Sequence, residues 1–181
     1  MRLNFLSVIR LRPAVSESFD FEAELAVVIG KPMRRATAAT ALDCVFGYRC
    51  FNVMSLRDYQ RKTSQYTMGK NVDATGAFGP CLVTADELPP GASGQSIQGR
   101  LNGTVMQSSN TSDMIWGVAD TIVLITECMT LEPGDVIIMG TPGGVGAARK
   151  PPVSMKHGDV FEVEIEQIGV LSSPIRDEQA P

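Results

Sequence analysis

The sequence predicts an α+β fold in which β-sheet dominates. Short apolar segments of strand length recur along the chain, and residues 160–168 alternate between apolar and polar side chains. Only one long stretch, which begins at Thr111, repeats its apolar residues with a helical period. A chain of 181 residues can bury a substantial core. With no internal repeat or linker in the sequence, we predict a single domain spanning residues 1–181.

The predicted elements of the first half begin with a strand at FDFEAELAVVIGK, residues 19–31. Its apolar side chains share one parity, and the carboxylates of Asp20, Glu22 and Glu24 share the other. The Ala-rich residues 36–46 predict a short helix, and residues 47–53 predict a second strand. One or two helical turns are predicted in 54–63, before a glycine-marked loop and the apolar segment CLVT.

In the second half, residues 100–107 predict a hairpin, because Asn102-Gly103 supplies the positive φ angles of a tight turn. A helix is predicted from Thr111. Its apolar face would comprise Ile115, Val118, Ala119, Ile122, Ile125 and Met129. The buried strand VIIMG follows, then a glycine-rich loop, and finally the alternating strand VFEVEIEQI.

Composition excludes several classes of partner. The formal net charge is −4 and the basic residues are scattered, so nucleic acid is not an expected partner. No apolar run reaches the roughly 18 residues that span a bilayer, and the first residues lack a secretion signal, so no membrane association is expected. The 4 cysteines are widely spaced. Reduced cysteines in a cytoplasmic protein are the simplest reading.

The carboxylates of the first strand admit two readings. Period-2 acids usually mark a solvated strand face, as we expect for Glu162, Glu164 and Glu166 near the C-terminus. Alternatively, Glu22 and Glu24 present oxygens from one strand face with Cα atoms roughly 7 Å apart. Such a pair would suit a hard cation, namely Mg²⁺, Mn²⁺ or Ca²⁺.

The glycine-rich loop GTPGGVG, residues 140–146, does not fit a dinucleotide-binding turn. Arg149 stands where a small residue is needed, and the prolines after Lys150 cannot open the required helix. The loop either binds a carboxylate through its amides and the Thr141 hydroxyl or simply connects two strands. Lys70, between loop glycines, is either solvated or directed into a site. The single histidine, His157, lies in a turn, which argues against a catalytic triad.

Taken in order, several segments resemble the fumarylacetoacetate hydrolase superfamily, and among its members the acylpyruvase-type bacterial enzymes. The resemblance covers residues from about 19 to 175. It rests on FDFEAELAVVIGK, GYRCFNVMSLRDYQ, YTMGKNVDATGAFGP, LNGTVMQSSNTSDMIW, LEPGDVIIMGTPGGVG and KHGDVFEVEIEQIG. It implies a mixed β-sandwich roll, normally a homodimer, and a hydrolase that cleaves a C–C bond of an acylpyruvate-like 2-oxo acid through a metal-stabilised enolate.

The resemblance also implies roles for individual residues. Glu22 and Glu24 match two ligands of a divalent cation, Mg²⁺ in the first instance. Matches to the side chains that contact or polarise the small-molecule substrate are Arg57, Gln60 and Lys70. Thr141, with Gly140, matches the binder of the substrate carboxylate, and Asp73 matches an acid that follows the lysine.

Two departures from the family pattern widen the range of possible activities. Val53 stands where the family has an aspartate as third metal ligand. Residues 1–18 contain no histidine and form a short segment in place of the usual lid, so no base for a hydrolytic water is evident. The alternatives are a decarboxylase, tautomerase or isomerase acting on a related 2-oxo acid, or a catalytically impaired paralogue.

Overall fold

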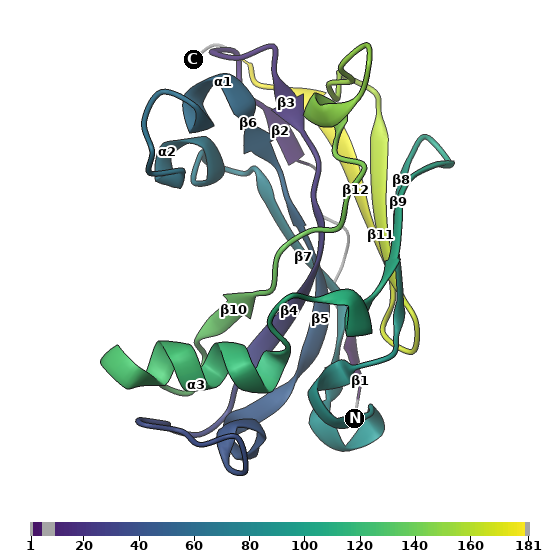
Figure 1. Ribbon diagram of the computed structural model, residues 1–181. Coiled ribbons are helices and arrows are strands. Elements are labelled where there is room, and N and C mark those ends of the chain that lie inside the picture. Colours follow the sequence, from purple (N-terminus) through teal and green to yellow (C-terminus); the bar gives the residue numbers. More distant parts are fainter. Residues whose placement is uncertain (1, 5–9, 180–181) are drawn as a thin grey trace.

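The computed structural model describes residues 2–4 and 10–179, and the strands of this part form two five-stranded sheets and a two-stranded pair (Figure 1). The first sheet has the order β1-β7-β5-β4-β10. Its strands are β1 (Arg2–Asn4), β7 (Gly76–Thr84), β5 (Val45–Val53), β4 (Ala23–Ile29) and β10 (Val136–Ile138). All its strand pairs are antiparallel.

The second sheet has the order β2-β12-β11-β8-β9. Its strands are β2 (Arg10–Arg12), β12 (Gly169–Asp177), β11 (Val160–Ile165), β8 (Ser96–Leu101) and β9 (Thr104–Asn110). Pairing of β2 with β12 is parallel and the other pairings are antiparallel, so the sheet is mixed. The short strands β3 (Phe19–Asp20) and β6 (Ser55–Leu56) pair with each other.

Helices are few and short. They are α1 (Arg57–Gln60), α2 (Thr67–Lys70) and α3 (Val118–Cys128), with 3₁₀ turns at Ala41–Cys44, Ala85–Glu87, Pro90–Ala92, Thr111–Asp113 and Gly146–Ala148. Figure 1 shows α1 and α2 together near one end of the first sheet and α3 across its other end. The segment that follows β10 runs along the sheet between them.

The core lies where the two sheets face each other. The side chains of Leu25 and Val27 on β4 are fully buried, as are Phe161 and Val163 on β11. Phe21 stacks on Phe161 with ring centroids 4.5 Å apart, which ties the start of β4 to the second sheet. The predicted mainly β, α+β fold is confirmed.

Two element predictions were wrong in ways that tertiary structure explains. Within residues 36–46 only Ala41–Cys44 is helical, and it is a 3₁₀ turn, because Val45 already pairs with β4. The predicted helix from Thr111 is interrupted. An Asn110–Asp113 capping box closes a 3₁₀ turn there, and α3 begins only at Val118. Ile115 is therefore 91% exposed instead of packing in a helical core.

The acids near the C-terminus lie on a solvated strand face, as expected. Glu162 and Glu164 on β11 are partly exposed and form ion pairs with Arg100 on the neighbouring strand β8. No helix in the part of the chain that the structure describes is both long enough and apolar enough to cross a bilayer.

Candidate active site

Glu24 on β4 and Glu22, just before that strand, point to the same side of the chain, and neither is solvated. Each is only 4% exposed. The adjacent strand β5 runs antiparallel to β4, with Glu24 opposite Phe51, and the Val53 amide donates to the Glu22 carbonyl oxygen at 3.0 Å. Because directly opposed residues share a face, Val53 lies on the same face as the two acids. The reading of these acids as a solvated strand face is wrong.

Arg57, the first residue of α1, joins two of the carboxylates. Its Nε donates to Asp20 Oδ2 at 2.7 Å, and its Nη1 donates to Glu22 Oε1 at 2.5 Å. The same Nη1 donates to Gln60 Oε1 at 2.8 Å, so Gln60 helps to orient the guanidinium. The Nη2 atom is buried and has no hydrogen-bond partner among the described residues. Most of the guanidinium is therefore committed to the protein, and the buried Nη2 is its one nitrogen without a partner among the described residues.

Lys70, at the end of α2, reaches Glu22 from the solvent side. Its Nζ donates to Glu22 Oε2 at 2.6 Å and to Ser55 Oγ at 3.3 Å. Ser55 Oγ in turn donates to Glu22 Oε1 at 3.1 Å. The Lys70 side chain remains 28% exposed, so one N–H can face a molecule entering from solvent. The reading of Lys70 as directed into a site is the one the geometry fits.

The two glutamates differ in charge state. Burial on its own would raise the pKa of Glu22, but the Lys70 hydrogen bond and the charges of Arg57 and Lys70 outweigh it and lower that pKa. Burial, then the hydrogen bond and charge of Glu22, raise the pKa of Glu24 to about 8 against an opposing hydrogen bond from the Gly140 amide. Glu24 is consequently the acid that holds a proton near neutral pH.

The negative charges of the ionised acids in the site outnumber the positive charges beside them. Three carboxylates, those of Asp20, Glu22 and Glu24, face two cations, Arg57 and Lys70. A proton on Glu24 balances the remaining single negative charge, whereas a divalent cation between Glu22 and Glu24 would leave one positive charge, which a substrate carboxylate could neutralise. Their oxygen donors suit a hard divalent ion. Among the described residues, however, no group of three or more His, Cys, Asp or Glu side chains is placed to hold a metal.

The raised pKa of Glu24 predicts that metal-free protein loses stability as pH rises. The pKa of Glu24 is about 8 when folded, against an ordinary value of 4.5, so the folded state holds an extra proton between these limits. The stability linked to that proton is present below about pH 4.5 and is lost through about pH 8, a change of a few kcal/mol. Urea unfolding across this window would measure it, and Glu24→Gln should flatten the slope. A wild-type stability that is level over the window would contradict the prediction.

The glycine-rich loop supplies backbone donors to these same acids. Gly140 N–H donates to Glu24 Oε2 at 2.6 Å. Gly146 and Ala147 donate to the two Asp20 oxygens at 2.7 and 2.9 Å. An added Cβ on Gly146 would lie 2.0 Å from the Val153 carbonyl oxygen, so only glycine fits there. The loop amides thus do bind carboxylates, and these carboxylates are the protein's own Glu24 and Asp20.

Thr141 lies at the start of this loop, and its hydroxyl is already engaged. Its Oγ1 donates to the Ala23 carbonyl oxygen at 3.0 Å and accepts from Gln107 Nε2 at 2.8 Å. Ala23 separates the two glutamates in sequence. Thr141 is therefore beside the acids, but a substrate carboxylate would need to compete with Ala23 for its proton.

Two other polar residues lie apart from this cluster. Asp73 is exposed and, within the described residues, makes no hydrogen bond or ion pair with the acids or with Lys70. His157 is in a surface turn, where its Nδ1 accepts from the Asp177 amide at 3.1 Å. The role of Asp73 toward a substrate stays a prediction.

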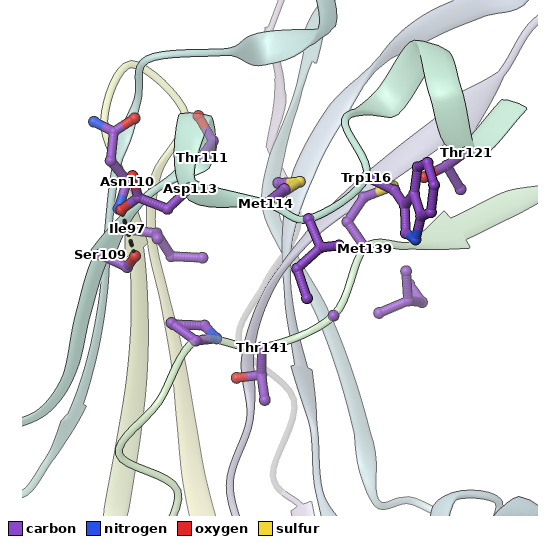
Figure 2. A pocket seen from close by; sticks show the side chains of 14 residues that line it. Ile97, Ser109, Asn110, Thr111, Asp113, Met114, Trp116, Thr121, Met139 and Thr141 are labelled. Carbon is purple, nitrogen blue, oxygen red and sulfur yellow. Dashed lines mark hydrogen bonds between the residues drawn. The ribbon is translucent and has the colours of Figure 1, made fainter.

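A cavity of about 470 Å³ adjoins the loop on the side of β9 (Figure 2). Gly140 and Thr141 form one wall, and these are the residues that contact Glu24 and Ala23. Figure 2 shows Met114, Trp116 and Met139 around an apolar part and the Ser109–Asp113 hydrogen bond on the opposite side. The cavity gives room for a ligand beside the loop that carries Gly140 and Thr141.

Sequence reasoning found the acids but missed two residues that organise them. Asp20 is 1% exposed and anchors both Arg57 and the glycine-rich loop. Gln107 is 1% exposed and bonds to Thr141 and to the Ala23 amide. The one available signal for Asp20 was its parity with Glu22 and Glu24. For Gln107 the only signal was its place in the segment LNGTVMQ.

A comparison with known proteins places the whole arrangement in a family. The family model described as fumarylacetoacetate (FAA) hydrolase C-terminal matches residues 7–176. The chain is 41% identical over 165 residues to a Xenopus laevis protein named oxaloacetate tautomerase fahd2, mitochondrial, covering 90% of this chain and 51% of that protein. It is 38% identical over 168 residues to oxaloacetate tautomerase YisK of Bacillus subtilis, covering 93% of this chain and 56% of that protein.

Solved structures support the same family assignment. A fumarylacetoacetate hydrolase from Exiguobacterium antarcticum superposes with a TM-score of 0.90 at 37% identity, covering 95% of this chain and 62% of that one. A 2-hydroxyhepta-2,4-diene-1,7-dioate isomerase from Mycobacterium marinum gives a TM-score of 0.85 at 37% identity, covering 96% and 64%. The chain thus spans between about half and two thirds of the length of these proteins. With most of its length matched by the family model and its fold shared at this level, the chain belongs to the fumarylacetoacetate hydrolase family.

Proposed function

We propose that this chain catalyses tautomerisation or isomerisation of a 2-oxo acid, with a divalent cation held by Glu22 and Glu24. The observation that carries the proposal is the Lys70 ammonium, 2.6 Å from Glu22 Oε2, beside a second buried carboxylate whose pKa is about 8. When bound, such a cation supplies Lewis-acid polarisation of the 2-oxo and carboxylate oxygens. Proteins named as oxaloacetate tautomerases and as a dioate isomerase are among the relatives, which supports this class of reaction.

Tautomerisation suits the residues present better than hydrolysis does. It moves one proton between a carbon and the oxygen of the neighbouring carbonyl group, so it needs a side chain or solvent molecule that takes up and returns that proton, but no activated water. Hydrolysis of a C–C bond needs a base within hydrogen-bond reach of a water molecule. His157 is engaged in a turn with Asp177, Asp20 and Glu22 are paired with Arg57 and Lys70, and Glu24 accepts from the Gly140 amide. Cleavage of an acylpyruvate, the activity first expected from the resemblance, is therefore not the function proposed.

The roles of the protein side chains follow from their free donors. Two of the three N–H groups of Lys70 are already fixed on Glu22 and Ser55. The third donates a hydrogen bond to the substrate oxygen on which negative charge develops. Arg57 fixes the Glu22 carboxylate and reaches the substrate only through Nη2. Gly140 N–H and Thr141 would bind the substrate carboxylate, and Glu24, freed from Gly140, would be one of the residues that hold the cation.

Lys70→Met should lower the rate of enol-to-keto conversion of oxaloacetate by about 10²-fold, since it removes one preorganised donor to the developing charge. Loss of absorbance by the enol, followed with Mg²⁺ or Mn²⁺ present, measures the rate. Glu22→Gln and Glu24→Gln should each remove the dependence on added metal. Lys31→Met, at an exposed lysine outside the site, is the matched control and should leave the rate unchanged. No conversion above background by the wild-type chain, or equal rates for Lys70→Met and wild type, would refute the proposal.

A further inference from the structure

Gln107 lies where the two sheets meet, at an edge of β4 that none of the described strands covers. The β10 ladder on β4 ends at Ile138, which pairs with Ala26. Beyond that point the chain continues as the glycine-rich loop, and Met139 N–H still donates to the Leu25 carbonyl oxygen at 3.0 Å. The next outward-facing backbone groups are the N–H and C=O of Ala23. Buried groups of this kind need partners, and within residues 2–4 and 10–179 no strand supplies them.

Side chains take the place of that missing strand. Gln107 Oε1 accepts from Ala23 N–H at 3.0 Å, and Thr141 Oγ1 donates to the Ala23 carbonyl oxygen at 3.0 Å. Gln107 Nε2 donates to Thr141 Oγ1 and to the Pro142 carbonyl oxygen, both at 2.8 Å. All the amide's hydrogen-bonding groups are therefore used. Its orientation is also fixed, because Ala23 N–H requires an acceptor and the Pro142 carbonyl requires a donor.

We propose that Gln107 is a positioning residue: it holds the start of the glycine-rich loop against β4 so that Gly140 and Thr141 stay beside Glu24. The role rests on the proposed function, in which Gly140 and Thr141 bind the substrate carboxylate. Gln107 itself is 1% exposed and belongs to β9 of the second sheet, so it acts through Thr141 and does not touch the substrate.

The surroundings of Gln107 are shaped for this task. It pairs with Gly99 across the β8–β9 ladder, and a Cβ added to Gly99 would lie 3.0 Å from Gln107 Oε1 and 2.7 Å from the Phe161 ring. Gly99 thus leaves the path from β9 to Ala23 open. The residue before Gln107 also binds the loop, because Arg149 Nη2 donates to the Met106 carbonyl oxygen while its Nε donates to that of Gly144. Two consecutive residues of β9 therefore anchor the same loop.

The first test is amide hydrogen exchange of residues 139–147 in Gln107→Met, which retains the length of the side chain and removes its hydrogen bonds. We expect exchange there to accelerate by at least about fivefold, the equivalent of one buried hydrogen bond. Gln95→Met is the matched control, since Gln95 is also buried, at 3% exposed, but among the described residues its bonds go to Thr111 and not to the loop. Gln107→Glu, which keeps the acceptor for Ala23 and loses the donors, should also accelerate exchange and serves if the methionine variant does not fold. Unchanged exchange in 139–147 would overturn the proposal.

The second test asks whether Gln107 works through Thr141. Gln107→Met should raise KM for oxaloacetate about fivefold with a smaller change in kcat, whereas Gln95→Met should change neither. In a Thr141→Val background the same substitution should raise KM little further, because both changes break one network. Additive effects of the two substitutions on KM would overturn the role through Thr141. A wild-type chain with no activity would refute the proposed function instead, and the exchange measurement would still decide the role of Gln107.

Discussion

Asp20→Asn is expected to destabilise the protein by about 3–5 kcal/mol, although it changes only one side-chain atom. The carboxylate is 1% exposed and accepts from Arg57 Nε and from the amides of Gly146 and Ala147. An asparagine would turn an NH₂ group toward one of these donors. It would also leave the buried Arg57 guanidinium with Glu22 as its one remaining anionic partner among the residues that the structure describes. Breaking a buried charge pair from one side is costly because the other charge stays desolvated.

Urea unfolding of wild type and variant would measure this loss as a fall in the free energy of unfolding. Asp177→Asn provides a matched control. It removes the same charge from an ion pair with Arg12 whose side chains are 26% and 45% exposed, and the loss there should be far smaller. Equal losses for the two variants would show that Asp20 is not the anchor of the loop.

Val53→Asp is expected to tighten binding of Mn²⁺ by at least about tenfold, because it adds a third anionic ligand to the two glutamates. Val53 lies across from Glu22 on the same strand face, and it is 9% exposed. Without metal the new carboxylate would crowd Glu22 and Glu24, so the variant should be less stable than wild type. A saturating cation should restore more stability to the variant than to wild type, by about 1.4 kcal/mol for a tenfold gain in affinity.

Titration calorimetry with Mn²⁺ would measure the affinities. Val53→Asn is the control, since it has the shape of aspartate without the charge and should gain much less. If the aspartate and asparagine variants bind Mn²⁺ equally, residue 53 is not part of a cation site. If neither variant nor wild type binds Mn²⁺, the cation assigned to Glu22 and Glu24 is itself wrong.

Local signals predicted those elements that depend on local chemistry. The hairpin between β8 and β9 turns at Asn102 and Gly103 with φ angles of 50° and 79°, as the dipeptide indicated. Propensity failed where tertiary pairing overrode it. Within the Ala-rich residues 36–46, Val45 and Phe46 belong to strand β5 and not to a helix. Strand β12 was not predicted, because Ser172, Ser173 and Pro174 interrupt its apolar pattern. Both strands are stabilised by partners distant in sequence.

The residues of the candidate site likewise divide into those with a local sequence signal and those whose role depends on partners distant in sequence. Glu22 and Glu24 could be identified because their spacing and the family resemblance reside in one short segment, and the resemblance also indicated Lys70 and Arg57. Asp20 and Gln107 could not, since their partners lie 126 and 34 residues away in the glycine-rich loop. A buried amide or carboxylate that serves other residues has no pattern of its own along the chain. Its role becomes visible only when the backbone groups that it satisfies are known.

The bond between Gln107 and Ala23 joins the two sheets at the site itself, because β9 belongs to one sheet and β4 to the other. A ligand that bridges Glu24 and Thr141 would therefore bind only molecules in which both sheets have docked. Its binding energy would add to the free energy of global unfolding, since no half-folded form retains the site. Catalytic activity would then require that the two five-stranded sheets have docked. A partly folded molecule in a cell would show no activity in an assay.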